Sequence, residues 1–399
     1  MSNVLVINAG SSSIKYQLIE AGSGLRRASG LVERIGEAAG RILHRGSEGH
    51  ERTVYVPNHT AGFAAMVDAF ALQGTPVESL EIVAIGHRVV QGAGEFVVPT
   101  LIDDHVADRI NELSELAPLH NPGHYQAIVA ARALFADVPH VAVFDTSFHQ
   151  SMPERAYTYA IDSVVAAETG VRRYGFHGIS HQVVSRRAAE FLGAPLSELR
   201  QIVLHLGNGA SACAVDRGRS IDTSMGLTPL EGLVMGTRSG DIDPGALLHL
   251  MRVGYDPEQL DHLLNQRSGL RGFTGTGDFR DVSEAASGGD PAAKLAIDVT
   301  VHRIRHYVGA YLVALGGADS IVFTAGVGEN NAALRAAVCA DLEWLGVRID
   351  PDRNEAATRE ARRISSDESG VAVLVIPTDE EAEIARQTWE LVAATAPVK

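Results

Sequence analysis

Residues 1–20, MSNVLVINAGSSSIKYQLIE, place a turn rich in glycine and serine between two apolar stretches. Apolar and β-branched residues dominate Val4–Ile7 and Ile14–Ile19, so both are predicted to be strands of one β-hairpin. The turn is not a P-loop, because the second glycine before Lys15 is missing and Tyr16 stands where that motif has Ser or Thr. It still gathers hydroxyl and amide donors beside one cation, a composition that suits phosphate. An ordinary polar hairpin is the alternative interpretation.

The same plan returns much later, in residues 201–215, QIVLHLGNGASACAV. An apolar strand, a small polar glycine turn and a second strand follow one another, and Asp216–Arg219 forms the next turn. Self-similarity over this distance indicates two related domains rather than a short tandem array, whose period would be tens of residues. We therefore expect two phosphate-facing hairpins, one in each domain, that meet across a cleft.

Length and composition limit the class of protein. The 399 residues exceed one ordinary core, and the 45% hydrophobic content suffices for two. The formal net charge of −15 argues against nucleic acid or an anionic membrane as a general partner. Cys213 and Cys339 lie in apolar surroundings, which predicts no disulfide framework and fits a reducing cytosol. The sequence shows neither a signal peptide nor a stretch that could span a bilayer, so we expect a soluble cytoplasmic protein.

Strands and helices are predicted to alternate as in an α/β fold. Asn121 and Pro122 are interpreted as an N-cap and first turn before an Ala-rich helix, and His140–Phe144 as the strand that follows. Asp145 comes just after this strand, where α/β sheets place ligand groups. We place the first domain at residues 1–150 and the second at residues 151–380, with the final helix, about 381–399, returning to the first.

A long amphipathic helix is predicted over residues 292–315. Its apolar residues at helical spacing are Ile297, Val301, Ile304, Val308, Tyr311 and Leu315. The strand Ser320–Thr324 and a glycine turn at residues 325–330 follow, and then another helix. Such a unit suits a nucleotide, because backbone approaches a ligand closely where side chains are absent.

Two arginines and two histidines stand out among the polar residues. Arg88 and Arg238 lie beside glycine-rich or apolar backbone, and Arg88 has no obvious acidic partner nearby in the sequence; this setting favours an anion over a surface salt bridge. His177 and His181 have the spacing of zinc ligands, but the Glu of the His-Glu-x-x-His motif is absent and Gly178 indicates a turn. No Gly-x-Ser-x-Gly elbow supports a serine hydrolase.

Ten short motifs, spread over essentially the whole chain, resemble those of the acetokinase family. They are NAGSSSIKY, GHRVV, APLHNP, FDTSFHQ, YGFHGISH, LHLGNGAS, MGTRSGDIDP, GDFRD, FTAGVGEN and PTDEE. The family belongs to the superfamily of acetate and sugar kinases, Hsp70 and actin. The resemblance implies an α/β fold of two ribonuclease-H-like domains around a nucleotide cleft and a homodimer. It also implies reversible phosphoryl transfer from ATP to acetate, giving ADP and acetyl phosphate, with Mg²⁺ (or Mn²⁺) and a place in acetyl-CoA biosynthesis.

The resemblance also implies which residues hold the nucleotide and the metal. The first hairpin contributes Asn8, Ser11, Ser13 and Lys15. The second hairpin contributes His205, Leu206, Gly207, Asn208 and Gly209. The nucleotide-contact segment is Asp278, Phe279 and Arg280, and the adenosine motif is Gly326, Val327, Gly328, Glu329 and Asn330. The metal environment consists of Asn8 and Glu380.

The acetate side of the site is implied in the same way. Arg88 is similar to the substrate-binding arginine, Asp145 to the catalytic acid residue, and His177 and Arg238 to the residues that stabilise the transition state. The pocket for the acetate methyl group would be Val90, Leu119, Phe176 and Pro229.

The charges of the reactants restrict these roles. Acetate is already ionised at neutral pH, since carboxyl groups lose their proton near pH ~4, so no general base is needed. Transfer between two anions depends on positioning and on electrostatic stabilisation of the moving phosphoryl group. Arg88 is expected to hold the carboxylate, and Arg238 with His177 to face the phosphoryl group. Asp145 is expected to organise metal and water, or to orient an arginine, rather than to accept a proton.

The sequence departs from the family pattern at two places. The family's HRVVHGGE is Arg88-Val-Val-Gln91-Gly-Ala-Gly-Glu95 here, so its acidic position is displaced, and we assign it no role. The family's TNEE is Thr378-Asp379-Glu380-Glu381, which adds an acid beside Glu380. Two alternatives stay open: a propionate kinase with a roomier pocket, and a nucleotide-regulated protein like actin or Hsp70.

Overall fold

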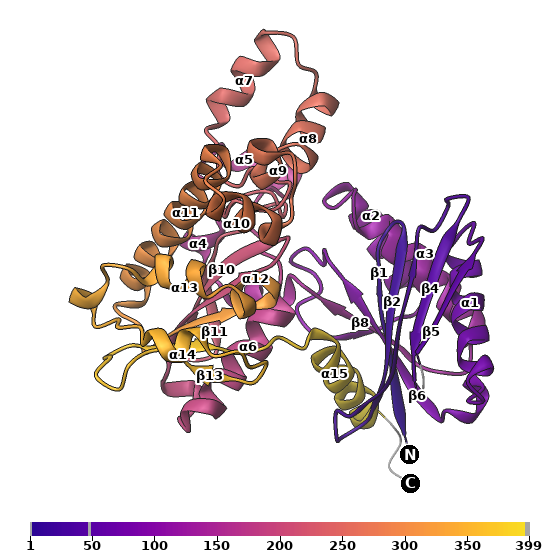
Figure 1. Cartoon of the computed structure of the whole chain (residues 1–399). Helices are drawn as coiled ribbons and strands as arrows, with labels where there is room; N and C mark the ends of the chain where they lie inside the picture. Colours follow the sequence, from indigo (N-terminus) through magenta and orange to yellow (C-terminus); the bar gives the residue numbers. More distant parts are fainter. Residues whose placement is uncertain (1, 47–48, 396–399) are drawn as a thin grey trace. The chain divides into compact units, whose positions relative to one another are not determined.

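A computed structural model describes residues 2–46 and 49–395. The chain forms two compact units (Figure 1). Unit 1 comprises the residues up to Ser147 together with those from Asp379 onward, and unit 2 comprises Phe148–Thr378. The chain therefore passes into unit 2 after Ser147 and returns to unit 1 after Thr378.

Unit 1 is built on a sheet that, in its described residues, has eight strands in the order β5-β4-β3-β2-β1-β6-β8-β7. The strands are β1 (Asn3–Ala9), β2 (Ser13–Glu20), β3 (Arg26–Glu33), β4 (Gly40–Arg45), β5 (Gly49–Val54), β6 (Ile82–Val89), β7 (Thr100–Leu101) and β8 (His140–Phe144). The helices are α1 (His59–Leu72), α2 (Asp104–Glu112), α3 (Asn121–Leu134) and α15 (Glu380–Thr395).

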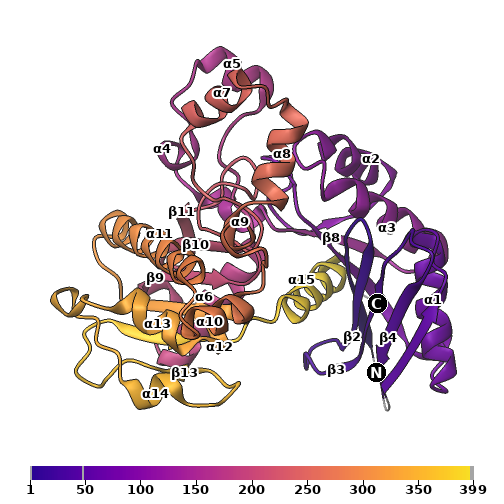
Figure 2. The ribbon, with the colours of Figure 1, turned by 45° about the horizontal axis from the view of Figure 1, so that its top comes forward.

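Helices cover both faces of this sheet. Ile85 belongs to the core formed with α1 and α3, where Phe63 and Phe70 are among the largest fully buried side chains. Gly86 points to the opposite face, because successive residues of a strand alternate. There α15 packs against β1, β6 and β8 (Figure 2). A Cβ on Gly86 would lie 2.4 Å from Thr388 Oγ1, so the glycine permits this close approach.

Unit 2, which is described throughout, has a six-stranded sheet in the order β11-β10-β9-β12-β14-β13. The strands are β9 (Arg200–Leu206), β10 (Ala210–Asp216), β11 (Arg219–Thr223), β12 (Ser320–Thr324), β13 (Arg362–Arg363) and β14 (Ala372–Val375). The helices are α4 (Glu154–Tyr157), α5 (Ser163–Thr169), α6 (Gly178–Leu192), α7 (Pro244–Arg252), α8 (Pro257–Gln266), α9 (Gly269–Thr274), α10 (Phe279–Ser287), α11 (Pro291–Leu315), α12 (Ala325–Asn330), α13 (Ala332–Cys339) and α14 (Pro351–Glu355).

The core of unit 2 follows from the apolar residues of its central strands. Val183 and Val184 of α6 pack against Val203, Val322 and Leu374, one from each of three neighbouring strands. The long helix α11 lies along β9 and β10 (Figure 2). None of the helices in the described ranges combines the length and the apolar character needed to span a bilayer.

The two sheets share one strand order. Unit 1 contains β3-β2-β1-β6-β8 and unit 2 contains β11-β10-β9-β12-β14. In each, three antiparallel strands are followed by two strands that run parallel to the first strand of the hairpin. Both predicted hairpins are present, so the α/β fold class with two related halves, predicted from the sequence, is confirmed.

Three local predictions need correction. Asn121 is not an N-cap: α3 begins at Asn121, and His120 occupies the cap position. The helix predicted over residues 292–315 is present as α11, but the buried residues of its first half are Ala293, Ala296 and Thr300, whereas Ile297 and Val301 are only half-buried. Helix α10 packs against α11.

The third correction concerns the segment after β12. Residues 325–330 form the short helix α12 instead of an open glycine turn. The helix begins directly after β12, and the reversal falls on Ala325, whose φ is +64°. A residue with a Cβ thus takes the left-handed conformation that a glycine adopts at lower cost.

Candidate functional site

The turn of the first hairpin is held by two helices of unit 1. Within the turn, the Gly10 N–H donates to the Ser13 carbonyl at 2.8 Å. His59, the first residue of α1, forms a 2.8 Å hydrogen bond to the Gly10 carbonyl through Nε2. Gly123 in the first turn of α3 lies so close that a Cβ there would be 2.9 Å from the Ser11 nitrogen. The turn is therefore well positioned, with the Ser11 side chain exposed and Ser13 half-buried.

Arg88 and Asp145 form an ion pair at one edge of the unit 1 sheet. Strands β6 and β8 are parallel neighbours, so their carboxyl ends lie side by side. Arg88 Nη2 and Nε donate to the two carboxylate oxygens of Asp145 at 2.5 and 3.1 Å. Arg88 Nη1 donates to Asn8 Oδ1 at 3.3 Å. The acidic partner that was not evident near Arg88 in the sequence is thus supplied by the fold.

Glu380 and Glu381 bring further negative charge to this edge. Glu380 Oε2 lies 3.8 Å from Arg88 Nε, and Lys15 forms an ion pair with Glu381. Burial raises the pKa of Glu380 to about 7; Arg88 opposes the shift, and the charges of Asp145 and Glu381 add to it. Three carboxylates thus face two cations. Both residues predicted for the metal environment, Asn8 and Glu380, approach the Arg88 guanidinium.

The segment after β6 is held by two residues of α3. The Val90 N–H donates to His124 Nδ1 at 3.2 Å. Asn121 accepts from the Gln91 N–H at 3.2 Å and donates to the Gln91 carbonyl at 3.0 Å. Burial, with the charge of Arg88, lowers the pKa of His124 to about 3, so its ring is a neutral acceptor. These supporting roles of Asn121 and His124 were not predicted, although a spacing of three residues places both on one face of a helix.

The residues predicted for the methyl pocket come from both units. In unit 1, the Val90 side chain is buried, whereas Leu119 is 50% exposed. In unit 2, Phe176 is fully buried, and its carbonyl accepts a 2.9 Å hydrogen bond from His149 Nε2. Pro229 accepts a 2.9 Å hydrogen bond from Arg238 through its carbonyl.

The two departures from the family pattern have local structural roles. Gln91 is fully buried, and its Oε1 accepts from the Ala93 N–H at 2.9 Å, which stabilises the turn that follows. Glu95 pairs with Arg109 at 2.9 Å. Asp379 accepts from the Ala382 N–H at 3.1 Å and so caps the start of α15.

The turn of the second hairpin is closed by backbone hydrogen bonds. The Gly207 N–H donates to the Gly209 carbonyl at 3.0 Å, and the Gly236 N–H donates to the Asn208 carbonyl at the same distance. A Cβ on Gly236 would overlap Asn208 Oδ1, so the loop beside the turn requires glycine. His205 Nδ1 hydrogen-bonds Ser180 Oγ at 2.8 Å.

His177 and Arg238 converge beside Gly209. A methyl group on Gly209 would lie 3.5 Å from His177 Nε2 and 3.9 Å from Arg238 Nη1. Burial lowers the pKa of Arg238, yet an arginine remains charged at neutral pH. Among the described residues, no carboxylate is close enough to form an ion pair with Arg238. A half-buried cation and an imidazole thus lie at one point of the second hairpin, an arrangement suited to an anion.

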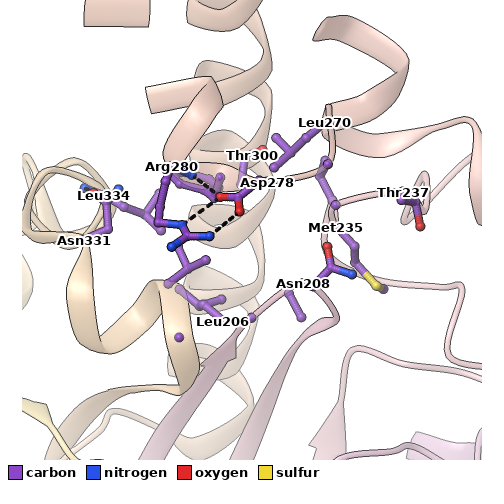
Figure 3. Close-up of a pocket in the computed structure, with 18 of the residues that line it drawn as sticks. Leu206, Asn208, Met235, Thr237, Leu270, Asp278, Arg280, Thr300, Asn331 and Leu334 are labelled. Carbon is purple, nitrogen blue, oxygen red and sulfur yellow. Dashed lines mark hydrogen bonds and ion pairs between the residues drawn. The ribbon is translucent and has the colours of Figure 1, made fainter. Parts of the chain in front are cut away.

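A pocket of about 720 Å³ opens next to this hairpin in unit 2 (Figure 3). Its lining residues that were predicted as nucleotide contacts are Leu206, Gly207, Asn208, Asp278, Phe279, Arg280, Gly326, Val327 and Asn330. Asp278 caps α10 and binds Arg280 through both oxygens, at 3.1 and 2.6 Å. Hydrogen bonds from Arg280 lower the pKa of Asp278 to about 2.

Four residues of unit 2 that were predicted as nucleotide contacts do not line the pocket: His205, Gly209, Gly328 and Glu329. Glu329 Oε1 instead accepts from the Thr378 N–H at 3.1 Å. The buried guanidinium of Arg335 donates to the Gly328 and Glu329 carbonyls at 2.9 and 3.0 Å, and so supports the C-terminal part of α12.

The prediction missed several lining residues, among them Met235, Gly236, Thr237, Leu270, Arg271, Thr300, Asn331 and Leu334. The first three belong to the MGTRSGDIDP motif, which was a signal for them. The others come from α9, from α11 and from the start of α13, and have no local sequence pattern.

Comparison with known proteins places this geometry in a family. The sequence profile of the acetokinase family matches residues 3–386. This chain belongs to the acetokinase family. A member named acetate kinase, from Leifsonia xyli subsp. xyli, is 59% identical over 396 residues, which cover 99% of this chain and 100% of that one.

Two solved structures of acetokinase relatives have the same fold. The acetate kinase of Porphyromonas gingivalis matches with a TM-score of 0.93 and 41% identity, over 98% of this chain and 100% of that one. A propionate kinase from Francisella tularensis subsp. tularensis SCHU S4 matches with a TM-score of 0.92 and 40% identity, over the same shares. The fold therefore does not distinguish acetate from propionate.

Proposed function

We propose that this protein is an acetate kinase, which transfers the terminal phosphoryl group of ATP to acetate and runs the reaction in both directions. The observation that carries the proposal is the full-length match, at 59% identity, to an acetate kinase. The match over residues 3–386 favours this activity over a role like that of actin or Hsp70. The products, ADP and acetyl phosphate, connect the reaction to acetyl-CoA formation.

The pocket of unit 2 is proposed to bind ATP or ADP. Its volume of about 720 Å³ lies within the usual range for small-molecule sites. The glycines of the second hairpin and of α12 let backbone approach the phosphates closely. The nucleotide contacts predicted from the sequence are proposed to act here, together with those predicted for the first hairpin.

Arg88 is proposed to bind the acetate carboxylate. Its guanidinium is oriented by two hydrogen bonds that it donates to Asp145 and one that it donates to Asn8 Oδ1. Both carboxylate oxygens of Asp145 accept hydrogen bonds from Arg88. Because acetate carries no proton to remove, Asp145 acts as an orienting group. Arg238 and His177 are proposed to stabilise the phosphoryl group during transfer, because they supply a cation and a donor at one point.

The residues of unit 1 fit a divalent metal that the nucleotide carries. Glu380 is a carboxylate 3.8 Å from Arg88, and burial raises its pKa although Arg88 opposes the shift. Among the described residues, no three His, Cys, Asp or Glu side chains form a metal site by themselves. Mg²⁺ typically uses one or two carboxylates plus substrate phosphates, and Mn²⁺ accepts similar oxygen ligands. Asn8 and Glu380 would hold the ion, which would neutralise phosphate charge.

Acid-dependent ADP formation tests the proposed function. The purified protein is assayed with Mg-ATP alone and with acetate, propionate or butyrate, and acyl phosphate is trapped as the hydroxamate. We expect product with acetate and less with propionate. Higher kcat/KM with propionate would make the protein a propionate kinase, the activity named for one of its structural relatives. Equal ADP formation without any acid would contradict both assignments.

Val90→Ala tests the proposed methyl pocket. The change removes two methyl groups from a buried side chain, so we expect the ratio of kcat/KM for propionate to that for acetate to rise. One methylene changes kcat/KM by about 10–200-fold in a fitted pocket, so the change in this ratio should not exceed that range. The control is Val89→Ala, a neighbour buried in the core, which should lower stability without changing this ratio. A lower melting temperature with an unchanged ratio in Val90→Ala would remove Val90 from the pocket.

Gly123→Ala tests whether the first hairpin serves the reaction. The new Cβ would lie 2.9 Å from the backbone of Gly10 and Ser11, so the turn must shift. We expect a loss of about 1–3 kcal/mol of unfolding free energy. Misplacement of a site by about 1 Å costs roughly 100-fold in activity. Gly309→Ala is the matched control, because nothing lies within 4 Å of its Cβ position in α11. A destabilised Gly123→Ala protein with full activity would contradict the role of the turn.

We further propose a cytoplasmic homodimer. Cys213 and Cys339 are both free thiols, as expected in a reducing compartment. No residue of α7 is buried, and Leu248, Met251 and Val253 in and after it expose about half of their surface. These apolar side chains offer a surface for a second copy. Light scattering should give twice the chain mass of 42.4 kDa, and a value equal to that mass would contradict the dimer.

A further inference from the structure

Ser211 lies at the centre of a buried chain of two histidines in unit 2. Its Oγ is 2.9 Å from His177 Nδ1 and 2.8 Å from His181 Nε2. Ser211 and His181 are both fully buried, whereas His177 is partly exposed. The two histidines, whose spacing resembles that of zinc ligands, are thus both turned to one hydroxyl group.

A single hydroxyl proton determines how these three groups share their protons. Ser211 can donate to only one of the two imidazoles. If its oxygen accepted from both rings, its own buried proton would have no acceptor among the described residues. Burial lowers the pKa of His181 well below its ordinary value, so this ring is neutral and carries one proton. Two arrangements remain. Either His181 Nε2 donates and His177 Nδ1 accepts, or the direction of both hydrogen bonds is reversed.

The other nitrogen of His181 distinguishes the two arrangements. His181 Nδ1 is buried and has no hydrogen-bond partner among the described residues. In the reversed arrangement Nδ1 would carry the proton, which would leave a buried N–H unsatisfied. Such donors are rare, and a buried polar group without a partner costs about 1–3 kcal/mol. A bare Nδ1 is the less costly choice, and it places the proton of His181 on Nε2.

We infer that Ser211 and His181 are positioning residues that hold His177 in its neutral form with the proton on Nε2. The inference rests on the proposed function. His181 Nε2 donates to Ser211, the Ser211 hydroxyl donates to His177 Nδ1, and the ring proton of His177 is on Nε2. Nε2 is the atom on the side of Gly209, where Arg238 Nη1 also lies.

This form of His177 suits its proposed task beside Arg238. A neutral N–H donor can share a phosphoryl group with a guanidinium without repulsion between two cations. The opposite neutral form would present a lone pair on Nε2 and repel the phosphoryl oxygens. His205 stacks on His177 with ring centroids 4.2 Å apart, which restricts the orientation of the ring.

Nitrogen NMR of the full-length protein tests the inference directly. Histidine ring nitrogens are labelled with ¹⁵N, because protonated and bare nitrogens have well-separated chemical shifts. The His177 signals are assigned by their loss in His177→Gln. We expect a bare Nδ1 and a protonated Nε2 at neutral pH. A proton on His177 Nδ1, in either the neutral or the cationic ring, would overturn the inference.

Two pairs of variants add a kinetic test. Ser211→Ala should lower kcat about 10–100-fold, the usual effect of removing a partner one step behind a functional group, and should change the KM for acetate and ATP little. His181→Met should lower kcat to a similar extent. His181→Gln keeps an N–H donor at the position of Nε2 and should therefore retain most of kcat. Ser185→Ala is the control, since Ser185 is a buried serine of α6 whose one hydrogen bond to the described part of the chain goes to the Gln182 carbonyl. Unchanged kcat in Ser211→Ala would contradict the inference.

The two proposals fail in different ways. A wild-type protein that forms no acyl phosphate would contradict the proposed function, whatever form His177 takes. An active wild-type protein with a proton on His177 Nδ1 would contradict only the inference. If a variant does not fold, the ¹⁵N spectrum of the wild-type protein still shows which ring nitrogen of His177 carries the proton.

Discussion

Arg238→Ala is expected to lower kcat by about a thousandfold or more while the fold survives, because a cation that faces transition-state charge contributes about 10³–10⁵ in rate. Among the residues that the structure describes, Arg238 donates hydrogen bonds to neutral groups only, the Pro229 carbonyl at 2.9 Å and Met235 Sδ at 3.6 Å. Its removal therefore leaves no buried carboxylate without a partner, and the melting temperature should change little. Steady-state kinetics and thermal unfolding of the same preparation measure both effects.

Arg238→Lys is the matched variant for this prediction. Lysine keeps the charge but lacks the planar fork of donors, so its kcat should lie between those of the wild type and Arg238→Ala. A second control is Arg252→Ala, which removes an exposed arginine of α7 and should leave kcat unchanged. A loss confined to the KM for ATP would place Arg238 in ground-state nucleotide binding instead.

Arg88→Ala is expected to lower kcat/KM for acetate by about 10²–10⁴-fold. A bidentate contact to a carboxylate consists of two charge-assisted hydrogen bonds, worth about 3–6 kcal/mol together. The same change also leaves the buried Asp145 carboxylate without its cation. Breaking a buried pair in this way costs about 3–5 kcal/mol of stability, so the melting temperature should fall as well.

Arg88→Lys separates these two effects. A lysine keeps a positive charge near Asp145 and should preserve most of the melting temperature. It cannot hold Asp145 and a carboxylate ligand with a rigid fork, so kcat/KM for acetate should stay well below the wild-type value. An unchanged KM for acetate in a folded Arg88→Lys or Arg88→Ala protein would contradict the assignment of Arg88 to acetate.

Much of the fold could be predicted because its signals are local. The stretches around Gly10 and Gly207 alternate apolar strand, small polar turn and apolar strand, and both form the expected hairpins. The strand His140–Phe144 is also present as predicted. Where the prediction was wrong, contacts with residues distant in the sequence determined the local structure. Asn121 has the chemistry of an N-cap, but its amide binds Gln91 instead of its own helix.

The candidate site was predictable where the motifs are dense. The segments around Asn208, Asp278 and Gly326 were chosen as nucleotide contacts, and all three line one pocket. The supporting residues were not predictable in this way. His124 and Arg335 act through the groups that they contact, and nothing in their neighbouring sequence distinguishes them from ordinary core residues. Ser211 belongs to the LHLGNGAS motif, but the motif does not show which groups its hydroxyl contacts.

The sequence by itself determined the α/β class, the two hairpins and the membership in the acetokinase family, because short-range patterns and motif order specify them. Only the tertiary structure decided which polar and charged side chains contact one another. Arg88 lies 57 positions from Asp145, and Ser211 lies 34 and 30 positions from the two imidazoles that it joins. Hydrogen bonds form over about 3 Å, so such partners are set by the sheet order and helix packing that bring distant residues together.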